Sequence, residues 1–204
     1  MKLHSNSLRF LALGDSYTIG EAVDESQRWP NQFVTMLAEN GIQFETPQII
    51  ATTGWTTDEL AAAIDRENPQ GPFDLVSLLI GVNNQYRGYS LESYQSEFET
   101  LLKQAILYAG GDSSKTIVIS IPDWGATPFA ADRDRALIAR EIDAFNTACK
   151  NISSNYNVAF IDITPNSRLA LNDSAMMASD HLHPSGIVYT HWARLVKDWF
   201  VSKK

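Results

Sequence analysis

Short apolar segments alternate with longer amphipathic segments along the whole chain. The apolar segments, most of them nearly continuous Val, Ile and Leu, span residues 9–13, 44–50, 75–80, 116–121 and 158–161. Segments of this length and composition are typical of strands that are buried on both faces of a sheet. The pattern therefore predicts five β-strands.

The segments between these strands carry apolar residues at helical spacing. A first helix follows Pro30 and reaches residue 37, and the sequence TTDE at 56–59 is a capping box that opens a second over 56–64. Further helices are predicted over residues 94–105 and 136–148, and from Pro184 to residue 199. Strands that alternate with helices favour a parallel sheet with right-handed crossovers, so we predict a three-layer α/β/α sandwich.

The length and composition fit one soluble globular domain over residues 1–204, with 44% hydrophobic and 20% charged residues. The net charge is −8 and no run of basic residues occurs. Nucleic acid is therefore not expected as a partner, because phosphate binding needs clustered Lys and Arg. Cys149 is the single cysteine, which excludes an internal disulfide, and we expect it to be buried.

No apolar segment is long enough to cross a membrane. The longest, residues 75–82, is far shorter than the roughly 20 residues that a spanning helix needs, and residues 10–13 are too few for the core of a signal peptide. We expect no integral membrane association and a cytoplasmic location for the sequence as it stands. A signal peptide removed earlier would instead indicate a periplasmic or secreted protein. The sequence does not indicate an oligomeric state.

Polar and glycine-rich residues follow each predicted strand. Residues 14–16 (GDS) follow the first strand, Gly54 the second, 81–84 (GVNN) the third and 122–125 (PDWG) the fourth, while Asp180 and His183 come after the fifth. The carboxyl ends of parallel strands meet at one edge of a sheet, which is where ligands bind in open α/β folds. We therefore expect these residues to converge on one site.

The residue types at this edge are those that ester hydrolysis by a serine requires. Ser16 supplies a hydroxyl nucleophile in a tight turn, His183 a base, and Asp180 a carboxylate that can reach Nδ1 of the imidazole if the segment turns. The amides of Ser16 and Gly54 and the side chain of Asn83 are candidate donors for an oxyanion hole. Taken singly, each residue is also explained by an ordinary turn or helix cap, but the joint arrangement at successive strand ends favours a catalytic site.

These same residues resemble the SGNH hydrolases, also called the GDSL-like lipase/acylhydrolase family. The matching blocks are Gly14-Asp15-Ser16, Gly54, residues 81–84 and residues 180–184, which together extend over nearly the whole chain. The resemblance implies a flavodoxin-like five-stranded sheet and a site without metal or other cofactor. It also implies that Ser16 is the nucleophile, Gly54 and Asn83 are oxyanion donors, and His183 is the base.

The sequence departs from the family pattern at three positions. Tyr17 replaces the leucine of the family name, and Asn84 stands where Asp is frequent, which alters the support of Asn83. His181 creates a His-x-His pattern with His183 that is also found in metal sites, although only His4 and His191 could add further imidazoles. A loop position near the site entrance is the simpler interpretation of His181.

We expect a small-molecule ester as substrate, of the short-chain, acetylated-sugar or lysophospholipid type. Aromatic residues near the strand ends could contact it, namely Tyr17, Trp55, Tyr86 and Trp124. Phe129 is more readily interpreted as core, and Arg87 as the partner of a nearby acidic residue rather than of the substrate.

Two alternative functions use the same architecture. One is a catalytically silent ligand-binding module, which would not need Ser16, Asp180 and His183 together. The other is a phosphotransfer or flavin-binding domain, since these also use flavodoxin-like sheets. A receiver-type phosphotransfer domain would carry an acidic cluster at the strand ends, and a bound flavin would be visible by its absorbance.

Overall fold

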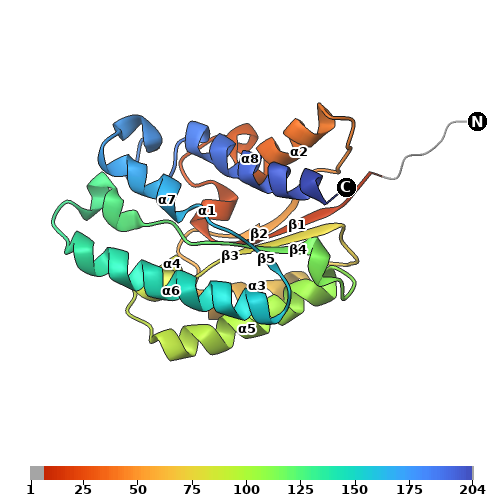
Figure 1. The fold of residues 1–204 in the computed structure, drawn as a ribbon, viewed down its shortest axis with the longest axis horizontal. Helices are drawn as coiled ribbons and strands as arrows, with labels where there is room; N and C mark the ends of the chain where they lie inside the picture. Colours follow the sequence, from red (N-terminus) through yellow and green to blue (C-terminus); the bar gives the residue numbers. More distant parts are fainter. Residues whose placement is uncertain (1–6, 204) are drawn as a thin grey trace, which may run out of the picture.

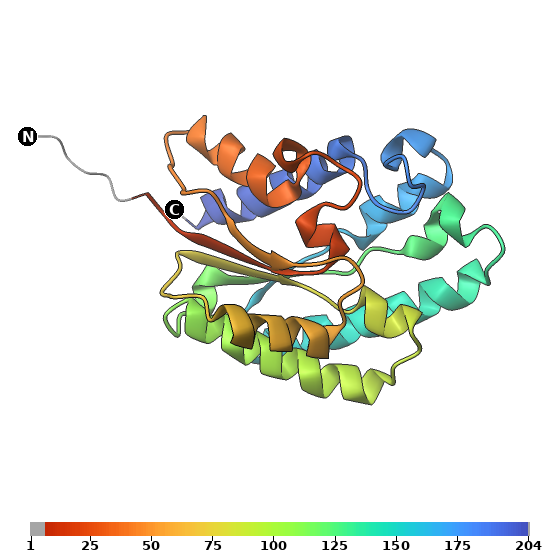
Figure 2. The ribbon, with the colours of Figure 1, turned by 180° about the vertical axis from the view of Figure 1, so that it is seen from behind.

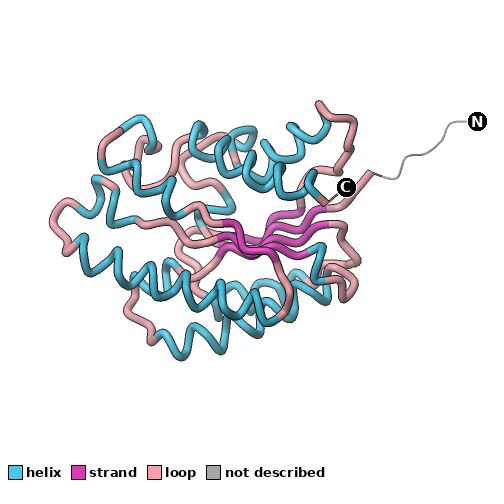
Figure 3. The backbone as a smooth tube through the Cα atoms, viewed as in Figure 1, coloured by secondary structure: helices cyan, strands magenta, loops and turns pink. Residues whose placement is uncertain are grey.

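The computed structural model describes residues 7–203, so His4 lies outside the described residues. A five-stranded parallel sheet forms its middle layer (Figure 3), with β1 (Phe10–Gly14), β2 (Gln48–Ala51), β3 (Leu75–Leu79), β4 (Thr116–Ile119) and β5 (Ala159–Ile161). The strand order is β2-β1-β3-β4-β5, and every neighbouring pair is parallel. This order is the flavodoxin-like one, so the predicted fold class is confirmed.

Helices cover both faces of the sheet (Figures 1 and 2). On one face, α2 (Trp29–Ala38) packs against α8 (Gly186–Ser202). On the other face, α5 (Leu91–Tyr108) lies between α3 (Thr57–Glu67) and α6 (Arg135–Asn155). The short helices are α1 (Ser16–Ile19), α4 (Val82–Tyr86) and α7 (Thr164–Ser167). Single 3₁₀ turns occur at Glu25–Gln27, Ser113–Lys115, Trp124–Ala126, Pro128–Ala130, Arg168–Leu171 and Ser174–Met176.

The hydrophobic core fills the space between these layers. Every residue of β1, β3 and β4 is buried, whereas the edge strands β2 and β5 are partly exposed. Large side chains from the helices complete the core, among them Trp29 and Trp192, which are fully buried. The free Cys149 is also buried, as expected. Burial of this kind supplies most of the favourable free energy of folding.

The predicted helices form, and side chains cap two of them. Thr56 precedes α3 and makes the predicted capping box with Glu59, whose carboxylate accepts a hydrogen bond from the Thr56 amide at 2.9 Å. Asp134 caps α6 by accepting from the amide of Leu137 at 2.9 Å. Such caps satisfy amide groups that have no partner within the helix.

Several predicted boundaries differ from the structure, and two of them have a clear local reason. The second strand begins at Gln48, and Phe44 makes only an isolated bridge with Leu8, because Pro47 in between lacks an amide hydrogen for the sheet. The last helix begins at Gly186 instead of Pro184, which is held in an isolated antiparallel bridge with Met177.

The order of the strands determines where a ligand can bind. The chain leaves β1 toward β2 on one side, and β3 then pairs with the other side of β1. Loops that leave two adjacent strands in opposite directions open a crevice at the carboxyl ends of those strands. Ser16 follows β1 and Asn83 follows β3, so both lie at this crevice. Within residues 7–203, no helix is both long and apolar enough to span a membrane.

Candidate active site

Ser16 is the first residue of α1, directly after β1. The turn between strand and helix is tight, and a Cβ on Gly14 would lie 2.2 Å from Oγ1 of Thr18 and 2.6 Å from the Leu79 carbonyl oxygen. Only glycine therefore fits at position 14. Asp15 caps α1 by accepting a hydrogen bond from the Tyr17 amide at 3.0 Å. The helix start leaves the Ser16 amide without a partner inside the helix.

Asp180 and His183 form a compact pair in the loop before α8. Oδ2 of Asp180 lies 2.6 Å from Nδ1 of His183, and Oδ1 of the same carboxylate accepts from the amides of Leu182 (3.0 Å) and His183 (2.9 Å). The segment is a turn built on the aspartate and not a turn of helix. One carboxylate thus fixes both the loop and the imidazole.

The same contacts set the charge of Asp180. Partial burial raises the pKa of this carboxyl, but hydrogen bonds from the His183 ring and from two backbone amides outweigh that effect, so the pKa lies below its usual value of 3.8. Asp180 is therefore ionised at neutral pH. An ionised carboxylate at Nδ1 favours the tautomer with the proton on Nδ1, which leaves Nε2 free to accept a proton.

Ser16 and His183 line one pocket of about 160 Å³. Its walls are mostly apolar, and the side chain of Tyr17 forms one of them, with its ring packed on the His183 ring at a centroid distance of 5.2 Å. The other lining residues are Val82, Asn83, Tyr86, Trp124, Phe129 and Leu182. Residues that follow β1, β3 and β4 therefore meet residues of the loop before α8 at one pocket, although they are far apart in the sequence.

Hydrogen bonds connect the segments that contain the predicted oxyanion donors Gly54 and Asn83. The Asn83 side chain donates one hydrogen bond to the Trp55 carbonyl at 2.9 Å, and Arg87 donates to the Gly54 carbonyl at 2.6 Å. Gly54 itself has a φ of +88°, which favours glycine. The loop after β2 is thus fastened to α4 and to the residue that follows it, and the second amide hydrogen of Asn83 stays free for a ligand.

Two further side chains support this arrangement. Arg87 also pairs with Glu59 at 3.3 Å, so it has the acidic partner that the sequence suggested. Asn84 accepts from the Thr57 amide at 3.1 Å and donates to the Thr57 hydroxyl at 2.6 Å. A side-chain amide can bond to both a donor and an acceptor. Asn84 therefore ties the segment after Asn83 to Thr57 without the charge of an aspartate.

Two sequence-based expectations are corrected. Trp55 does not line the pocket, because its side chain packs against the hydrophobic core. Phe129 is not a core residue: it is 46% exposed and forms part of the pocket rim. His181 lies in an exposed turn with a φ of +59°, which agrees with its interpretation as a loop residue. No group of three or more metal-ligating side chains occurs within residues 7–203.

A hydrogen-bonded chain behind the pocket is not visible in the sequence. The Trp124 indole donates to Gln85 at 2.7 Å, and Gln85 donates to Glu141 at 2.7 Å. Gln85 directly follows the GVNN block, but nothing in the local sequence links it to α6. The contact depends on the way α4 and α6 pack, which only the structure shows.

Asp15 is buried beside the nucleophile and lacks a full set of partners. Its second oxygen, Oδ2, has no hydrogen-bond partner among the described residues, and the carboxyl is 0% exposed. Burial raises the pKa of Asp15 from 3.8 to about 7, against the opposing effect of hydrogen bonds from backbone amides. Asp15 is therefore neutral below pH 7 in the folded protein, although it ionises near pH 4 in the unfolded chain.

We expect the Asp15→Asn variant to remove a pH dependence of stability. Because the pKa of Asp15 is raised in the folded protein, its contribution to the free energy of unfolding is fully present below pH 3.8. This contribution is lost as the pH rises to about 7. The difference between these two pKa values corresponds to a loss of up to roughly 4 kcal/mol in the free energy of unfolding. Urea unfolding at pH 5 and pH 8 should show the wild type weakening toward pH 8 by more than the variant. Equal changes in both proteins would contradict this assignment.

Comparison with known proteins agrees with the fold and the motif blocks. The chain matches the GDSL-like lipase/acylhydrolase family over residues 12–190. A comparison with curated proteins found no match in sequence.

Solved structures of low sequence identity share the whole fold. A lipase/acylhydrolase from Enterococcus faecalis is 20% identical, with a TM-score of 0.72 and 96% of each chain covered. An acetylxylan esterase from Geobacillus stearothermophilus is 20% identical, with a TM-score of 0.70 and coverage of 98% of this chain and 96% of that one. The esterase EstA from Pseudoalteromonas sp. is 17% identical, with a TM-score of 0.69 and coverage of 96% of this chain and 98% of that one. Since the family match extends over most of the sequence, this chain belongs to the GDSL-like lipase/acylhydrolase family of ester-bond hydrolases.

Proposed function

We propose that this protein is a serine esterase that cleaves carboxylic esters with short acyl groups through a covalent acyl-enzyme. The observation that carries the proposal is the shared pocket of Ser16 and His183, with the Asp180 carboxylate 2.6 Å from Nδ1 of the histidine. A hydroxyl, an imidazole and an orienting carboxylate in this order are the parts of a serine hydrolase. The Ser16 hydroxyl takes the role of nucleophile.

In the first half of the reaction, Nε2 of His183 takes the proton of the Ser16 hydroxyl as Oγ attacks the ester carbonyl carbon. The carbonyl bond becomes a single bond in the tetrahedral intermediate, and the oxygen carries the negative charge. His183 then gives its proton to the departing alcohol oxygen, and the acyl group stays on Ser16. Asp180 stabilises the imidazolium while the ring carries the extra proton.

In the second half, His183 takes a proton from water, and the resulting hydroxide attacks the acyl-enzyme. The second tetrahedral intermediate collapses, the proton returns to Oγ of Ser16, and the carboxylic acid leaves. Tyr17 keeps the imidazole in place through both halves, because its ring packs directly on the ring of His183.

The negative oxygen of each intermediate is stabilised by the amides of Ser16 and Gly54 and by the side chain of Asn83. The contacts of Asn83 and Arg87 with the carbonyl groups of Trp55 and Gly54 hold these donors before substrate arrives. Donors that need no rearrangement during the reaction lower the barrier most effectively.

Asn83→Ala should lower kcat by roughly 100-fold to 1,000-fold, because it removes one oxyanion donor. KM should change much less, since the donor acts on charge that develops in the transition state. Steady-state kinetics with p-nitrophenyl acetate provide the measurement. Asn40→Ala, a matched change at an exposed asparagine that follows α2, should keep wild-type kcat. A large rise in KM with unchanged kcat would show that Asn83 only binds substrate.

The size of the pocket favours short acyl groups. Its volume of about 160 Å³ is smaller than the roughly 300–1,000 Å³ of sites for drug-sized ligands, and the walls are mostly apolar. We expect kcat/KM for p-nitrophenyl octanoate to be at least about tenfold below that for the butyrate, because the longer chain must leave the pocket past Tyr86 and Phe129. Equal values for acetate, butyrate and octanoate would show that the acyl chain does not enter this pocket.

The esterase function itself is tested by the release of p-nitrophenol from p-nitrophenyl acetate with and without EDTA. The proposal predicts hydrolysis that EDTA leaves unchanged. Loss of activity in EDTA would indicate metal-dependent chemistry. A folded protein that hydrolyses none of the three esters and is not labelled by a fluorophosphonate would instead be a binding module on the same fold.

A further inference from the structure

A second hollow lies beside the proposed acyl pocket. Its volume is about 440 Å³, and it shares Tyr86 and Trp124 with the smaller pocket. The two rings meet edge to face at a centroid distance of 5.2 Å. The hollow lies between the end of α4 and the beginning of α6. Because both spaces have the same two rings in their walls, one substrate could reach from the reacting serine into the larger space.

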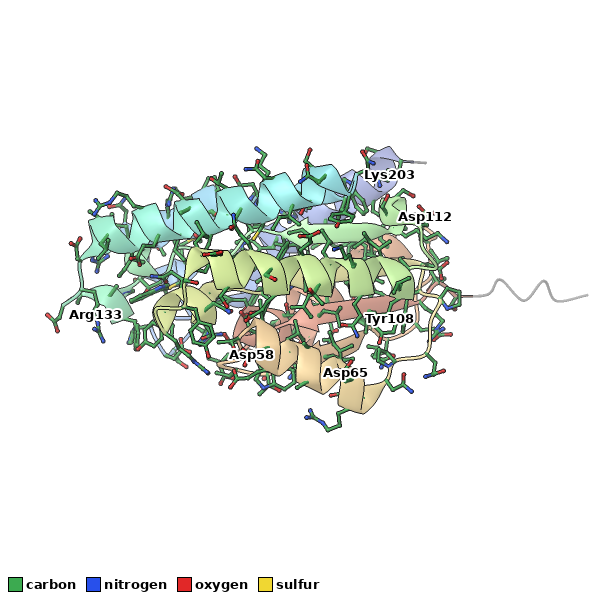
Figure 4. The ribbon with its side chains drawn as sticks, turned by 90° about the horizontal axis from the view of Figure 1, so that it is seen from below. Asp58, Asp65, Tyr108, Asp112, Arg133 and Lys203 are labelled. Carbon is green, nitrogen blue, oxygen red and sulfur yellow. The ribbon has the colours of Figure 1, made fainter. Side chains whose placement is uncertain are left out.

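The walls of this hollow combine aromatic rings with charged groups. Arg133 and Asp134 come from the loop that leads into α6, and Glu141 comes from the second turn of that helix. Figure 4 shows Arg133 at one end of the molecule, opposite to Lys203 and Asp112. That end holds the carboxyl ends of the strands, so Arg133 lies at the same end of the sheet as the proposed catalytic residues.

Hydrogen bonds within the protein hold part of the polar lining in place before a ligand binds. The Trp124 indole donates to Gln85, and Gln85 donates to one oxygen of Glu141, each at 2.7 Å. Asp134 uses one oxygen to cap α6. The second oxygen of each carboxylate can accept from a ligand, and Arg133 makes no hydrogen bond or ion pair that involves its side chain within the described residues. The hollow therefore presents both acceptors and donors beside aromatic surfaces.

A lining of this kind suits a neutral sugar. One face of a pyranose ring consists of C–H groups that pack on an aromatic ring, and its hydroxyl groups need both donors and acceptors when they leave water. The net charge of the lining disfavours an anionic alcohol. One guanidinium stands against two carboxylates, so a phosphate or carboxylate on the ligand would be repelled.

We propose that this second hollow binds the alcohol half of the substrate, and that this alcohol is a neutral sugar or a similar polyol. The inference rests on the proposed esterase function, and it selects sugar esters over lysophospholipids, whose head groups carry phosphate. The acyl group then occupies the pocket at Ser16, while the sugar lies beyond Tyr86 and Trp124. Binding of the remote half contributes to kcat/KM only if it positions the ester for attack.

Acetate release from a matched series of acetyl esters tests the proposal. We expect kcat/KM for monoacetylated xylobiose to be at least about tenfold above that for ethyl acetate, because only the sugar ester can bind in the hollow. Both esters have an alkyl alcohol as leaving group. The value for 1-acetylglycerol 3-phosphate should be below that for 1-acetylglycerol. Equal values within both pairs, or a preference for the phosphate ester, would overturn the assignment.

Variants in the hollow link the preference to its residues. Arg133→Ala should lower kcat/KM for acetylated xylobiose several-fold more than for ethyl acetate, whereas Arg140→Ala, an exposed arginine on α6 outside the hollow, should leave the ratio between the two substrates unchanged. Asp134→Asn keeps a helix-capping side chain but removes one negative charge, so it should reduce the disadvantage of the phosphate ester. Unchanged substrate ratios in both Arg133→Ala and Asp134→Asn would show that the hollow does not contact the alcohol.

A binding measurement separates this inference from the esterase function. Addition of xylobiose should shift the indole N–H resonance of Trp124 in an NMR spectrum, with Trp124→Phe used for assignment, and glycerol 2-phosphate at the same concentration should not. If Ser16-dependent hydrolysis of ethyl acetate is present but xylobiose leaves this resonance unchanged, the inference fails and the esterase stands. If xylobiose shifts the resonance and no ester is hydrolysed, the proposed function fails while the sugar site stands.

Discussion

Replacing Ser16 with alanine should lower kcat for p-nitrophenyl acetate by a factor on the order of 10⁶, because no other group on the pocket wall can take its place as nucleophile. The hydroxyl lies at the start of α1 and its removal leaves the cap formed by Asp15 intact. We therefore expect the variant to fold like the wild type. Steady-state kinetics measured together with circular dichroism will separate lost chemistry from lost structure.

A matched control for this variant is Ser179→Ala, which changes an exposed serine in the turn before Asp180. Its kcat should stay close to that of the wild type. If Ser16→Ala retained a tenth or more of the wild-type kcat, Ser16 would not be the nucleophile, and the proposed acyl-enzyme would have to form elsewhere.

Asp180→Asn should lower kcat by roughly 10⁴-fold while the protein stays folded. An asparagine oxygen can still accept from the amides of Leu182 and His183, so the turn should keep its shape. The other end of the amide is a donor and cannot accept from Nδ1. The imidazole is then expected to carry its proton on Nε2, where it can no longer accept the proton of Ser16.

The control for Asp180→Asn is Asp173→Asn in the same long loop. Asp173 also caps a turn, by accepting from the Ala175 amide at 2.9 Å, but it does not contact His183. This variant should keep wild-type kcat. A loss of activity in Asp180→Asn that is matched by an equal loss in Asp173→Asn would assign the effect to the loop and not to the carboxylate at Nδ1.

The fold could be predicted from the sequence because its strands and long helices have strong periodic patterns. The continuous apolar segments of β1, β3 and β4 are buried on both faces, which is the property that the prediction used. The capping box of Thr56 and Glu59 could also be predicted, because its residues lie only three positions apart in the sequence. The short helices α1 and α4 have fewer than six residues, so they carry no periodic signal.

The site could be predicted where its residues follow a strand closely or, like Asp180 and His183, lie close together in the sequence. Ser16 and Asn83 lie within four residues of the ends of β1 and β3, and the strand order places both at one crevice. Trp55 also follows a strand, yet its side chain turns into the core, because position in a loop does not fix where a side chain points. The chain from Trp124 through Gln85 to Glu141 depends on helix packing between distant segments and leaves no local pattern.

The mass spectrum of the protein after reaction with a fluorophosphonate tests directly whether Ser16 is the nucleophile. We expect one adduct per chain, on the peptide that contains Ser16, formed in the wild type and absent in Ser16→Ala. The rate of labelling should match the rate at which p-nitrophenyl acetate hydrolysis is lost. An adduct on another residue, or full hydrolytic activity in a protein that carries the adduct on Ser16, would contradict the assignment of Ser16 as the nucleophile.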